Sequence, residues 1–323
     1  MNILITGGAG FIGSHLSEML IETGHHQVYC LDNFSTEDPD TARAQNISDL
    51  INHSQFTLFE TDITDFPGLK AIFDNYSFDH IVHLAGLSHV KESLEDPLRY
   101  SRVNIMGTHN ILELSRLYHA KNIIFASSHL VYGNKKSLTF TEEDPCDKPL
   151  SPYAATMIAA ETLCKTYHHL YDMNFVILRL ASVYGPRQKS HQTIHQFSGL
   201  IYDNIAIPQL MDGSGSEDYI HVDDVTDSII RGIEWLDTRS QPEIDIYNIG
   251  SSTAQSEKDI ITLLERELNT KAIIKWLPEP REKAVDRILN IARAERNLGF
   301  SPRIPIETGI ADFINWFRQT QTG

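Results

Sequence analysis

Short apolar runs recur along the first 180 residues, separated by longer segments in which apolar residues return every three or four positions. The short runs are rich in valine, isoleucine, phenylalanine and tyrosine, which favours strands, whereas the longer spacing favours amphipathic helices. One run, "NIIFA" at residues 122–126, is apolar at four of five positions, as expected for a strand buried on both faces. The predicted strands are residues 2–6, 27–32, 56–60, 80–85, 122–127 and 175–180.

Helical segments connect these strands one after another along the chain. Such alternation is typical of a parallel sheet whose connecting helices cover both faces. The predicted fold class is therefore α/β, a doubly wound parallel sheet. The predicted helices of this part are residues 11–23, 66–74, 97–119 and 153–171.

The pattern changes after residue 180. A polar, turn-rich loop comes first, and shorter elements follow it, with no internal repeat and no low-complexity linker. We therefore predict a first lobe over residues 1–180 and a smaller lobe over 181–323, packed closely together, with segments near 218–250 returning to the first lobe. The later predicted elements are strands at 218–221 and 244–249 and helices at 256–268 and 306–318.

Charge and composition narrow the possible partners. The 323 residues contain 27 Lys and Arg against 43 Asp and Glu, a net charge of −16, which repels nucleic acid and anionic membranes. No apolar run approaches the ~18 residues of a membrane span, and the N-terminus has no basic leader. The three cysteines match neither a disulfide framework nor a metal site. We predict a cytoplasmic protein that acts on a small molecule, without metal, nucleic acid or membrane.

The stretch "ITGGAGFIGSHL" places Gly7, Gly10 and Gly13 between the first predicted strand and the first helix. Glycines there allow a tight turn, a close approach of the backbone to a diphosphate, and close packing of helix on sheet. The next strand ends with Asp32, nineteen residues after Gly13, where a carboxylate accepts the ribose hydroxyls of NAD and repels the extra phosphate of NADP. A tight turn without a ligand is the alternative, but the combination predicts NAD.

Two later stretches fit the same cofactor. Asp62 and Ile63 follow the third strand, where they would border the adenine, although Asp62 would equally suit the N-cap of a helix. The fourth strand ends in "HLAG", whose small residues would admit the cofactor. The predicted dinucleotide site further includes Phe11, Ile12, Asn33, Leu84, Ala85 and Gly86.

Several motifs in order carry a resemblance to a known family. "TGGAGFIGSHL", "VNIMGTHNILE", "FASSHLVYG", "SPYAAT" and "LRLASVYGPRQ" resemble the extended short-chain dehydrogenase/reductases that act on nucleotide sugars, and "DYIHVDDVTDSI" and "YNIGSS" extend the resemblance toward the C-terminus. Within that family the chain looks most similar to UDP-glucuronate and UDP-glucose 4-epimerases. The resemblance implies a Rossmann fold with bound NAD, a smaller C-terminal substrate lobe and a nucleotide-linked sugar as substrate.

The resemblance also implies roles for individual residues. Tyr153 would take a proton from a sugar hydroxyl as hydride passes to NAD, Ser128 would hold that hydroxyl in line, and Asn104 would position a water or backbone near the nicotinamide. The family has a lysine four residues after the tyrosine, which binds the nicotinamide ribose and lowers the pKa of the tyrosine. Here the residue is Met157. A thioether carries no charge to favour the phenolate, so we expect a slow enzyme or an inactive one.

The residues after Ser128 separate the reaction types of the family. Its 4,6-dehydratases carry an Asp-Glu pair there and its decarboxylases keep the glutamate, whereas this chain has His129 and Leu130. This favours oxidation and reduction at one sugar carbon, as in epimerisation. His129 would either replace the missing base, since histidine titrates near neutrality, or be a packed side chain. Lys91 would either contact the substrate or be a solvated lysine.

The anion contacts of the family are altered. An arginine usually precedes the Asp-Tyr pair of "GSGSEDY" and contacts the substrate diphosphate, but this chain has Glu217, which would repel it. Arg187 in "YGPRQ" matches the uronate branch and is the best remaining contact. A further arginine of the family is either displaced to Arg281 or Arg287 or absent. Ser182 completes the predicted substrate site.

The helices at 97–119 and 153–171 carry apolar stripes, and in the family the equivalent helices pair across a two-fold axis into a four-helix bundle. We therefore predict a homodimer. Two functional hypotheses stay open: an NAD-dependent nucleotide-sugar epimerase or oxidoreductase with an altered site, which includes a non-UDP sugar as substrate, and an NAD-binding protein with little or no turnover.

Overall fold

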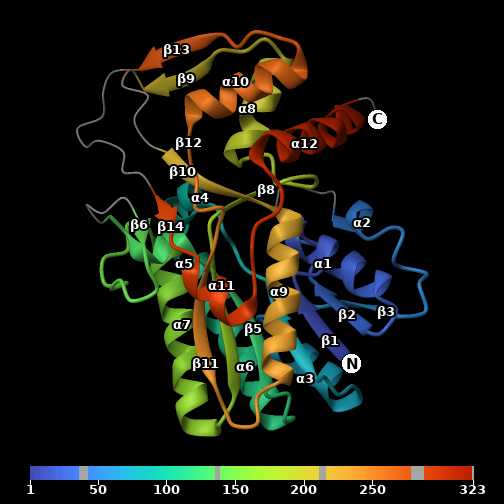
Figure 1. Ribbon diagram of the computed structural model, residues 1–323. Coiled ribbons are helices and arrows are strands. Elements are labelled where there is room, and N and C mark those ends of the chain that lie inside the picture. The colour runs from blue at the N-terminus through green and yellow to red at the C-terminus, as the bar shows by residue number, and fades with distance from the viewer. Residues whose placement is uncertain (36–42, 135–138, 211–215, 278–286, 322–323) are drawn as a thin grey trace.

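A seven-stranded parallel sheet forms the centre of the computed structural model, which describes residues 1–35, 43–134, 139–210, 216–277 and 287–321 (Figure 1). The strand order is β11-β7-β5-β4-β1-β2-β3, and every neighbouring pair is parallel. Chain order reverses between β1 and β4, where doubly wound folds bind their ligands. The strands are β1 (Asn2–Thr6), β2 (Gln27–Asp32), β3 (Phe56–Glu60), β4 (His80–His83), β5 (Asn122–Ser128), β7 (Asn174–Leu180) and β11 (Ile244–Ile249).

Helices cover both faces of this sheet. On one face α1 (Phe11–Glu22) packs against α9 (Val222–Asp237), which also contacts α11 (Ala292–Leu298). On the other face α6 (Thr108–Leu117) lies between α3 (Phe66–Asn75) and α7 (Pro152–Tyr171). The predicted α/β class and its doubly wound parallel sheet are confirmed.

Local sequence sets where α7 begins. The Ser151 side chain accepts a hydrogen bond from the Ala154 N–H, and Pro152 occupies the first helical position, where its missing N–H costs nothing. Tyr153 therefore lies in the first turn of a helix whose start is fixed. The helix ends at Asp172, which adopts the left-handed conformation.

The helix predicted over residues 97–119 is continuous from Pro97 to Leu117, but its middle is of another type. The segment comprises α5 (Pro97–Tyr100), a π-helix η1 (Ser101–Gly107) and then α6. Each π turn holds one more residue than an α turn, and such segments often occur at functional sites. Asn104, at the centre of η1, turns toward the end of β4 as a result.

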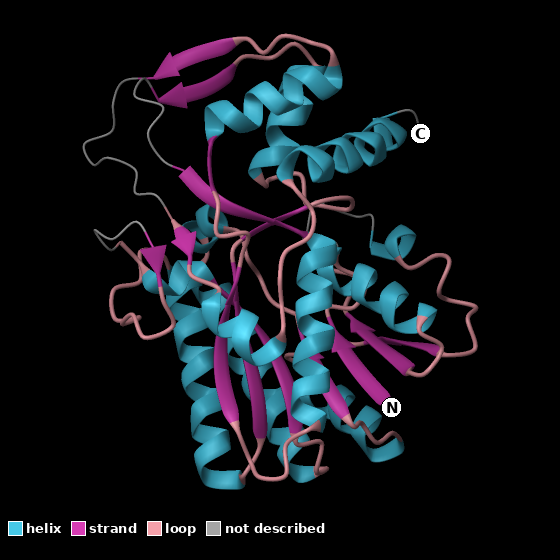
Figure 2. Cartoon of the chain, viewed as in Figure 1, coloured by secondary structure: helices cyan, strands magenta, loops and turns pink. Residues whose placement is uncertain are grey.

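A smaller lobe lies beyond the carboxyl ends of the large sheet (Figure 2). Its three-stranded sheet has β10 (Ser216–His221) between β8 (Ser182–Tyr184) and β12 (Ala254–Ser256). A separate apolar core joins it to α8 (Thr193–Tyr202), α10 (Glu257–Leu268) and α12 (Ile306–Gln321). The remaining elements are α2 (Arg43–Asn46), α4 (Val90–Glu95), η2 (His129–Tyr132), β6 (Thr139–Phe140), β9 (Ile207–Leu210), β13 (Ile274–Leu277) and β14 (Ile288–Leu289).

Segments that follow residue 180 contribute to both lobes. β11 is a strand of the large sheet and α9 packs against that sheet, whereas β10 belongs to the small sheet. The lobe boundary at residue 180 stays a prediction. Among the residues that the structure describes, none of the helices has the length and apolar character to cross a bilayer.

Candidate cofactor and active site

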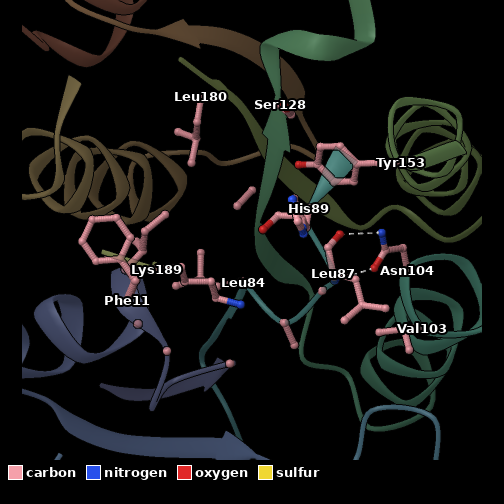
Figure 3. Close-up of a pocket in the computed structure, with 18 of the residues that line it drawn as sticks. Phe11, Leu84, Leu87, His89, Val103, Asn104, Ser128, Tyr153, Leu180 and Lys189 are labelled. Atoms are coloured by element: carbon pink, nitrogen blue, oxygen red, sulfur yellow. Dashed lines mark hydrogen bonds between the residues drawn. The ribbon is translucent and has the colours of Figure 1, made fainter. Parts of the chain in front are cut away.

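A cavity of about 570 Å³ opens between the two lobes, at the carboxyl ends of the central strands (Figure 3). Its volume is within the range of about 300–1,000 Å³ that is usual for ligand sites. Most residues predicted from the sequence to bind cofactor or substrate come together in its wall. They are Gly7, Gly10, Phe11, Ile12, Gly13, Asp32, Asn33, Asp62, Ile63, Leu84, Ala85, Gly86, Asn104, Ser128, His129, Tyr153, Met157 and Ser182.

The turn between β1 and α1 fits a diphosphate. Gly7 has φ +70°, and a Cβ there would lie 2.9 Å from the Ala85 nitrogen, so no other residue fits without displacement. A Cβ on Gly13 would lie 2.3 Å from the Gly7 oxygen. Helix α1 begins at Gly10 with no side-chain cap, which leaves its first N–H groups to a ligand. These features fit the diphosphate of the predicted NAD.

Asp32 ends β2, is 3% exposed as a residue, and has its carboxylate surrounded by donors. Its Oδ2 accepts a hydrogen bond from the Ala9 N–H at 3.2 Å, and its Oδ1 accepts one from the Phe34 N–H at 3.1 Å. Arg43 adds a third bond, from Nη1 to Oδ1 at 2.8 Å. Arg43 also lines the cavity and was not predicted from the sequence.

Asp62 lies beside this group. Its Oδ2 accepts a hydrogen bond from Asn33 Nδ2 at 2.6 Å, and its Oδ1 accepts two from Thr64 at 2.7 Å. Burial would raise the pKa of Asp62, but these bonds and the nearby Arg102 hold it below its usual value. The alternative that Asp62 caps a helix is wrong, because Asp65 caps α3.

Asn104 fixes the loop that follows β4. Its Oδ1 accepts a hydrogen bond from the Leu87 N–H at 2.8 Å, and its Nδ2 donates to the Leu87 carbonyl at 2.9 Å, as Figure 3 shows. The same Nδ2 also lies 3.0 Å from Thr156 Oγ1 on α7. The π-helix therefore ties this loop to α7, which carries Tyr153.

Ser128 and Tyr153 form the centre of the site. Ser128 Oγ accepts a hydrogen bond from the Leu130 N–H at 3.2 Å, so its own proton is available to the Tyr153 phenol, whose pKa Ser128 lowers. Burial raises the pKa of Tyr153, and Ser128 offsets only part of this rise. Met157 is buried one turn further along α7 and brings no charge to the phenol. At neutral pH Tyr153 is therefore protonated.

His129 is buried next to Ser128. Its Nδ1 lies 2.9 Å from the Leu180 carbonyl, and because a carbonyl only accepts, Nδ1 carries the proton of the neutral ring. Burial lowers the pKa of His129, against the opposing influence of Glu217. The neutral ring therefore keeps a lone pair on Nε2, as a base requires.

Glu217 does not line the cavity and is hydrogen-bonded to two neighbouring side chains. Its Oε2 accepts a hydrogen bond from Ser182 Oγ at 2.7 Å, and its Oε1 accepts one from Arg287 Nη1 at 3.2 Å. Burial would raise the pKa of Glu217, but His129, Ser182 and Arg287 hold it below its usual value. The charge of Arg287 is consequently neutralised, and Arg281 lies outside the described residues.

Besides Glu217, two further residues predicted to contact substrate do not line the cavity. Arg187 adopts φ +66°, which directs its guanidinium to Glu18 Oε1 at 2.6 Å and Ser14 Oγ at 3.1 Å on α1. Lys91 is exposed on α4. Lys189, two residues after Arg187, lines the cavity instead (Figure 3).

A contact between the two lobes at the cavity was not predicted from the sequence. The rings of His89, after β4, and His191, after β8, stack with centroids 4.1 Å apart and planes 22° apart. Both residues line the cavity. Neither lies in a motif, and only the folded chain brings their loops together.

Comparison with known proteins agrees with this geometry. The model of the NAD dependent epimerase/dehydratase family matches residues 3–250. UDP-glucuronate 4-epimerase of Thermodesulfobacterium geofontis is 34% identical over 98% of this chain and 96% of its own length. UDP-glucuronic acid 4-epimerase of Bacillus cereus, solved with UDP-glucuronic acid and NAD, is 30% identical with a TM-score of 0.89 over 99% of this chain and 100% of that one. UDP-glucose 4-epimerase of Thermotoga maritima, solved with UDP-glucose, is 28% identical with a TM-score of 0.87 over 99% and 100%. These matches confirm the predicted family and its cofactor: the chain belongs to the NAD dependent epimerase/dehydratase family.

Proposed function

We propose that the protein is an NAD-dependent epimerase of a nucleotide-linked sugar, which oxidises and reduces C4 of a UDP-hexose or UDP-hexuronate. The observation that carries this proposal is that Ser128 and Tyr153 line the same cavity as the glycine turn, with Ser128 close enough to lower the pKa of Tyr153. No carboxylate follows Ser128, so the residues that dehydration or decarboxylation uses there are missing. The similar epimerases support the choice of C4 and of a UDP-sugar.

The residues around the cavity divide between cofactor and substrate. The glycine turn would hold the diphosphate of NAD and Asp32 its ribose, and the bound cofactor would supply the acceptor and donor of hydride. The second lobe would hold the substrate, whose anionic groups would meet Lys189 rather than Arg187. The residues of that lobe which line the cavity include Ser182, Gln188, Lys189, His191, Thr193 and Tyr219.

Tyr153 would take the proton of the sugar hydroxyl and later return it. The hydroxyl of Ser128 would stabilise the phenolate and hold the sugar oxygen in line. General-base catalysis contributes about 10²–10⁴ in rate, and it depends on the fraction of base that is ionised. Because the pKa of Tyr153 is raised and Met157 brings no charge, that fraction is small. His129 is the residue that would replace the base, through its Nε2.

The raised pKa of Tyr153 and the uncharged Met157 also favour a second function, a protein that binds NAD with little or no turnover. Both functions predict NAD binding, so turnover separates them. The experiment incubates the purified protein with UDP-glucuronate, UDP-glucose and their C4 epimers and measures product sugars. Wild type is compared with Met157→Lys, with Tyr153→Phe, and with Ala155→Lys, which adds the same charge on an exposed position of α7.

We expect slow turnover in wild type, a rise of about 10–10³-fold in Met157→Lys because the ammonium lowers the pKa of Tyr153, and none in Tyr153→Phe. Ala155→Lys should behave as wild type. If wild type matches Met157→Lys, the lysine is dispensable and His129→Ala becomes the next test. If neither protein converts any sugar, the binding function replaces the epimerase.

We further propose that the chain forms a homodimer through η1, α6 and α7. Met106, Leu117 and Leu170 on these helices are 53%, 47% and 59% exposed, although α6 and α7 pack side by side. A four-helix bundle with a second copy would cover these side chains.

A further inference from the structure

Asp32, the carboxylate expected to select NAD, has a cationic partner in the cavity wall. Arg43 Nη1 lies 2.8 Å from Asp32 Oδ1 and 3.2 Å from Asn33 Oδ1. The side chains of Arg43 and Asp32 are 17% and 2% exposed, so this ion pair is largely shielded from water. Both residues line the cavity at the end of β2.

Carboxylate and guanidinium at this position have opposite consequences for the cofactor. An acid after the second strand accepts the hydroxyls of the adenosine ribose and repels a 2′-phosphate, whereas a nearby arginine accommodates that phosphate. This chain has both groups in direct contact, so their charges cancel. The repulsion that would exclude NADP is therefore largely lost.

A second acid and a second arginine line the cavity nearby. Asp62 and Arg102 also line the cavity, and Arg102 favours the ionised form of Asp62. Two acids thus face two arginines at the adenosine end of the site. A guanidinium binds a phosphate with charge-assisted and often bidentate hydrogen bonds, which are stronger than the bonds of a carboxylate to a hydroxyl.

We propose that Arg43 determines cofactor specificity: together with Asp32 it makes a subsite for a 2′-phosphate, so that the cavity binds NADP nearly as well as NAD. The inference rests on the proposed binding of a dinucleotide in this cavity but not on turnover. A purely structural Arg43, which only orients Asp32, would instead affect both cofactors equally.

The test measures the dissociation constants of NAD and NADP by titration calorimetry on the full chain, after removal of any dinucleotide carried through purification. The variants are Arg43→Gln, which keeps a hydrogen-bond donor without the charge, and Arg43→Lys, which keeps the charge. The control is Arg231→Gln, because Arg231 pairs with Asp227 on α9 and does not line the cavity. Circular dichroism establishes that each variant is folded.

In wild type we expect dissociation constants for NADP and NAD within about tenfold of each other, a difference below about 1.4 kcal/mol. Arg43→Gln should weaken NADP by at least about tenfold more than NAD, because Asp32 then repels the phosphate unopposed. Arg43→Lys and Arg231→Gln should stay near wild type. Added salt should weaken NADP more than NAD, because it screens the phosphate contact.

Three results would overturn the proposal. The first is a wild-type preference for NAD of about 10³-fold or more, which leaves dinucleotide binding and the proposed function intact. The second is an equal loss of both cofactors in Arg43→Gln, which would make Arg43 a residue that merely orients Asp32. The third is the failure of wild type to bind either dinucleotide, which would remove the proposed function as well.

Discussion

His83 is buried at the end of β4 between two hydroxyl groups. Thr108 donates its proton to the Asn104 carbonyl at 2.6 Å, so it can only accept from His83 Nε2 at 2.9 Å. Thr6 already accepts from the Ala85 N–H and lies 2.6 Å from His83 Nδ1. The neutral ring with its proton on Nε2 satisfies all of these groups, and burial lowers the pKa of His83 to about 4.

We predict that His83 makes the fold sensitive to mild acid. Its pKa is lower in the folded chain than in the unfolded chain, so its stabilising contribution is complete above about pH 6.5 and falls as the pH approaches 4. Between about pH 7.5 and pH 5 wild type should lose about 2 kcal/mol more unfolding free energy than His83→Gln, which cannot titrate. Urea unfolding at the two pH values measures this difference. Equal losses in the two proteins would show that another group is responsible.

At the level of elements, a buried ion pair holds α7 against the sheet. Glu161 on α7 accepts hydrogen bonds from Arg179 Nε at 2.9 Å and Nη2 at 2.7 Å on β7, and from Ser127 Oγ at 2.6 Å on β5. Ser127 directly precedes Ser128. The pair therefore sets where Tyr153, two turns earlier on α7, lies relative to Ser128.

We predict that Glu161→Gln destabilises the fold by about 3–5 kcal/mol, because it leaves the Arg179 charge buried without its counter-ion. The matched control is Glu243→Gln, because the side chains of Glu243 and its partner Arg239 are 48% and 32% exposed, so that the loss of this surface pair should cost less than about 1 kcal/mol. Urea unfolding compares the two variants. Similar costs in both would mean that Glu161 does not anchor the helix.

The elements differ in how far sequence could predict them. The strands of the large sheet were predicted because each is an apolar run bounded by turns. Helix α9 was missed although Val222, Val225, Ile229 and Ile233 follow helical spacing, because β10 runs into it without a breaking residue. Apart from β10, which was predicted at residues 218–221, the short strands of the second lobe and the π-helix were not predicted, since contacts distant in sequence determine them.

The site divides in the same way. Its nucleotide end was predictable, because motif residues at the ends of parallel strands must meet at one edge of the sheet. The side formed by the second lobe could not be predicted. Arg187 adopts a left-handed backbone conformation and its side chain contacts α1, so that Lys189 lines the cavity instead. The contacts of Arg43 with Asp32 and of Arg287 with Glu217 could not be predicted from sequence spacing either, because each depends on how separate segments fold together.

At the scale of the whole molecule, the net charge of −16 opposes any anionic ligand, yet among the described residues four cationic side chains line the cavity. Two of them lie beside acids at the adenosine end, and Lys189 lies on the side of the second lobe. The local field thus differs in sign from the average one, as the proposed binding of a sugar nucleotide beside the dinucleotide would require. These cationic residues are Arg43, Arg99, Arg102 and Lys189.

The proposed dimer gives the last prediction. Leu170 on α7, Leu117 on α6 and Met106 on η1 are exposed apolar side chains on neighbouring helices, and apolar side chains gathered on one surface mark protein–protein contacts. Wild type at micromolar concentration should therefore scatter light as two chains, and Leu170→Glu together with Met106→Glu should scatter as one, because four charges would be buried at the two-fold interface. The control is Ile205→Glu, equally exposed at 52% but in the second lobe, which should leave the dimer intact. A monomeric wild type would remove the four-helix bundle, whereas dissociation by Ile205→Glu would place the interface on the second lobe.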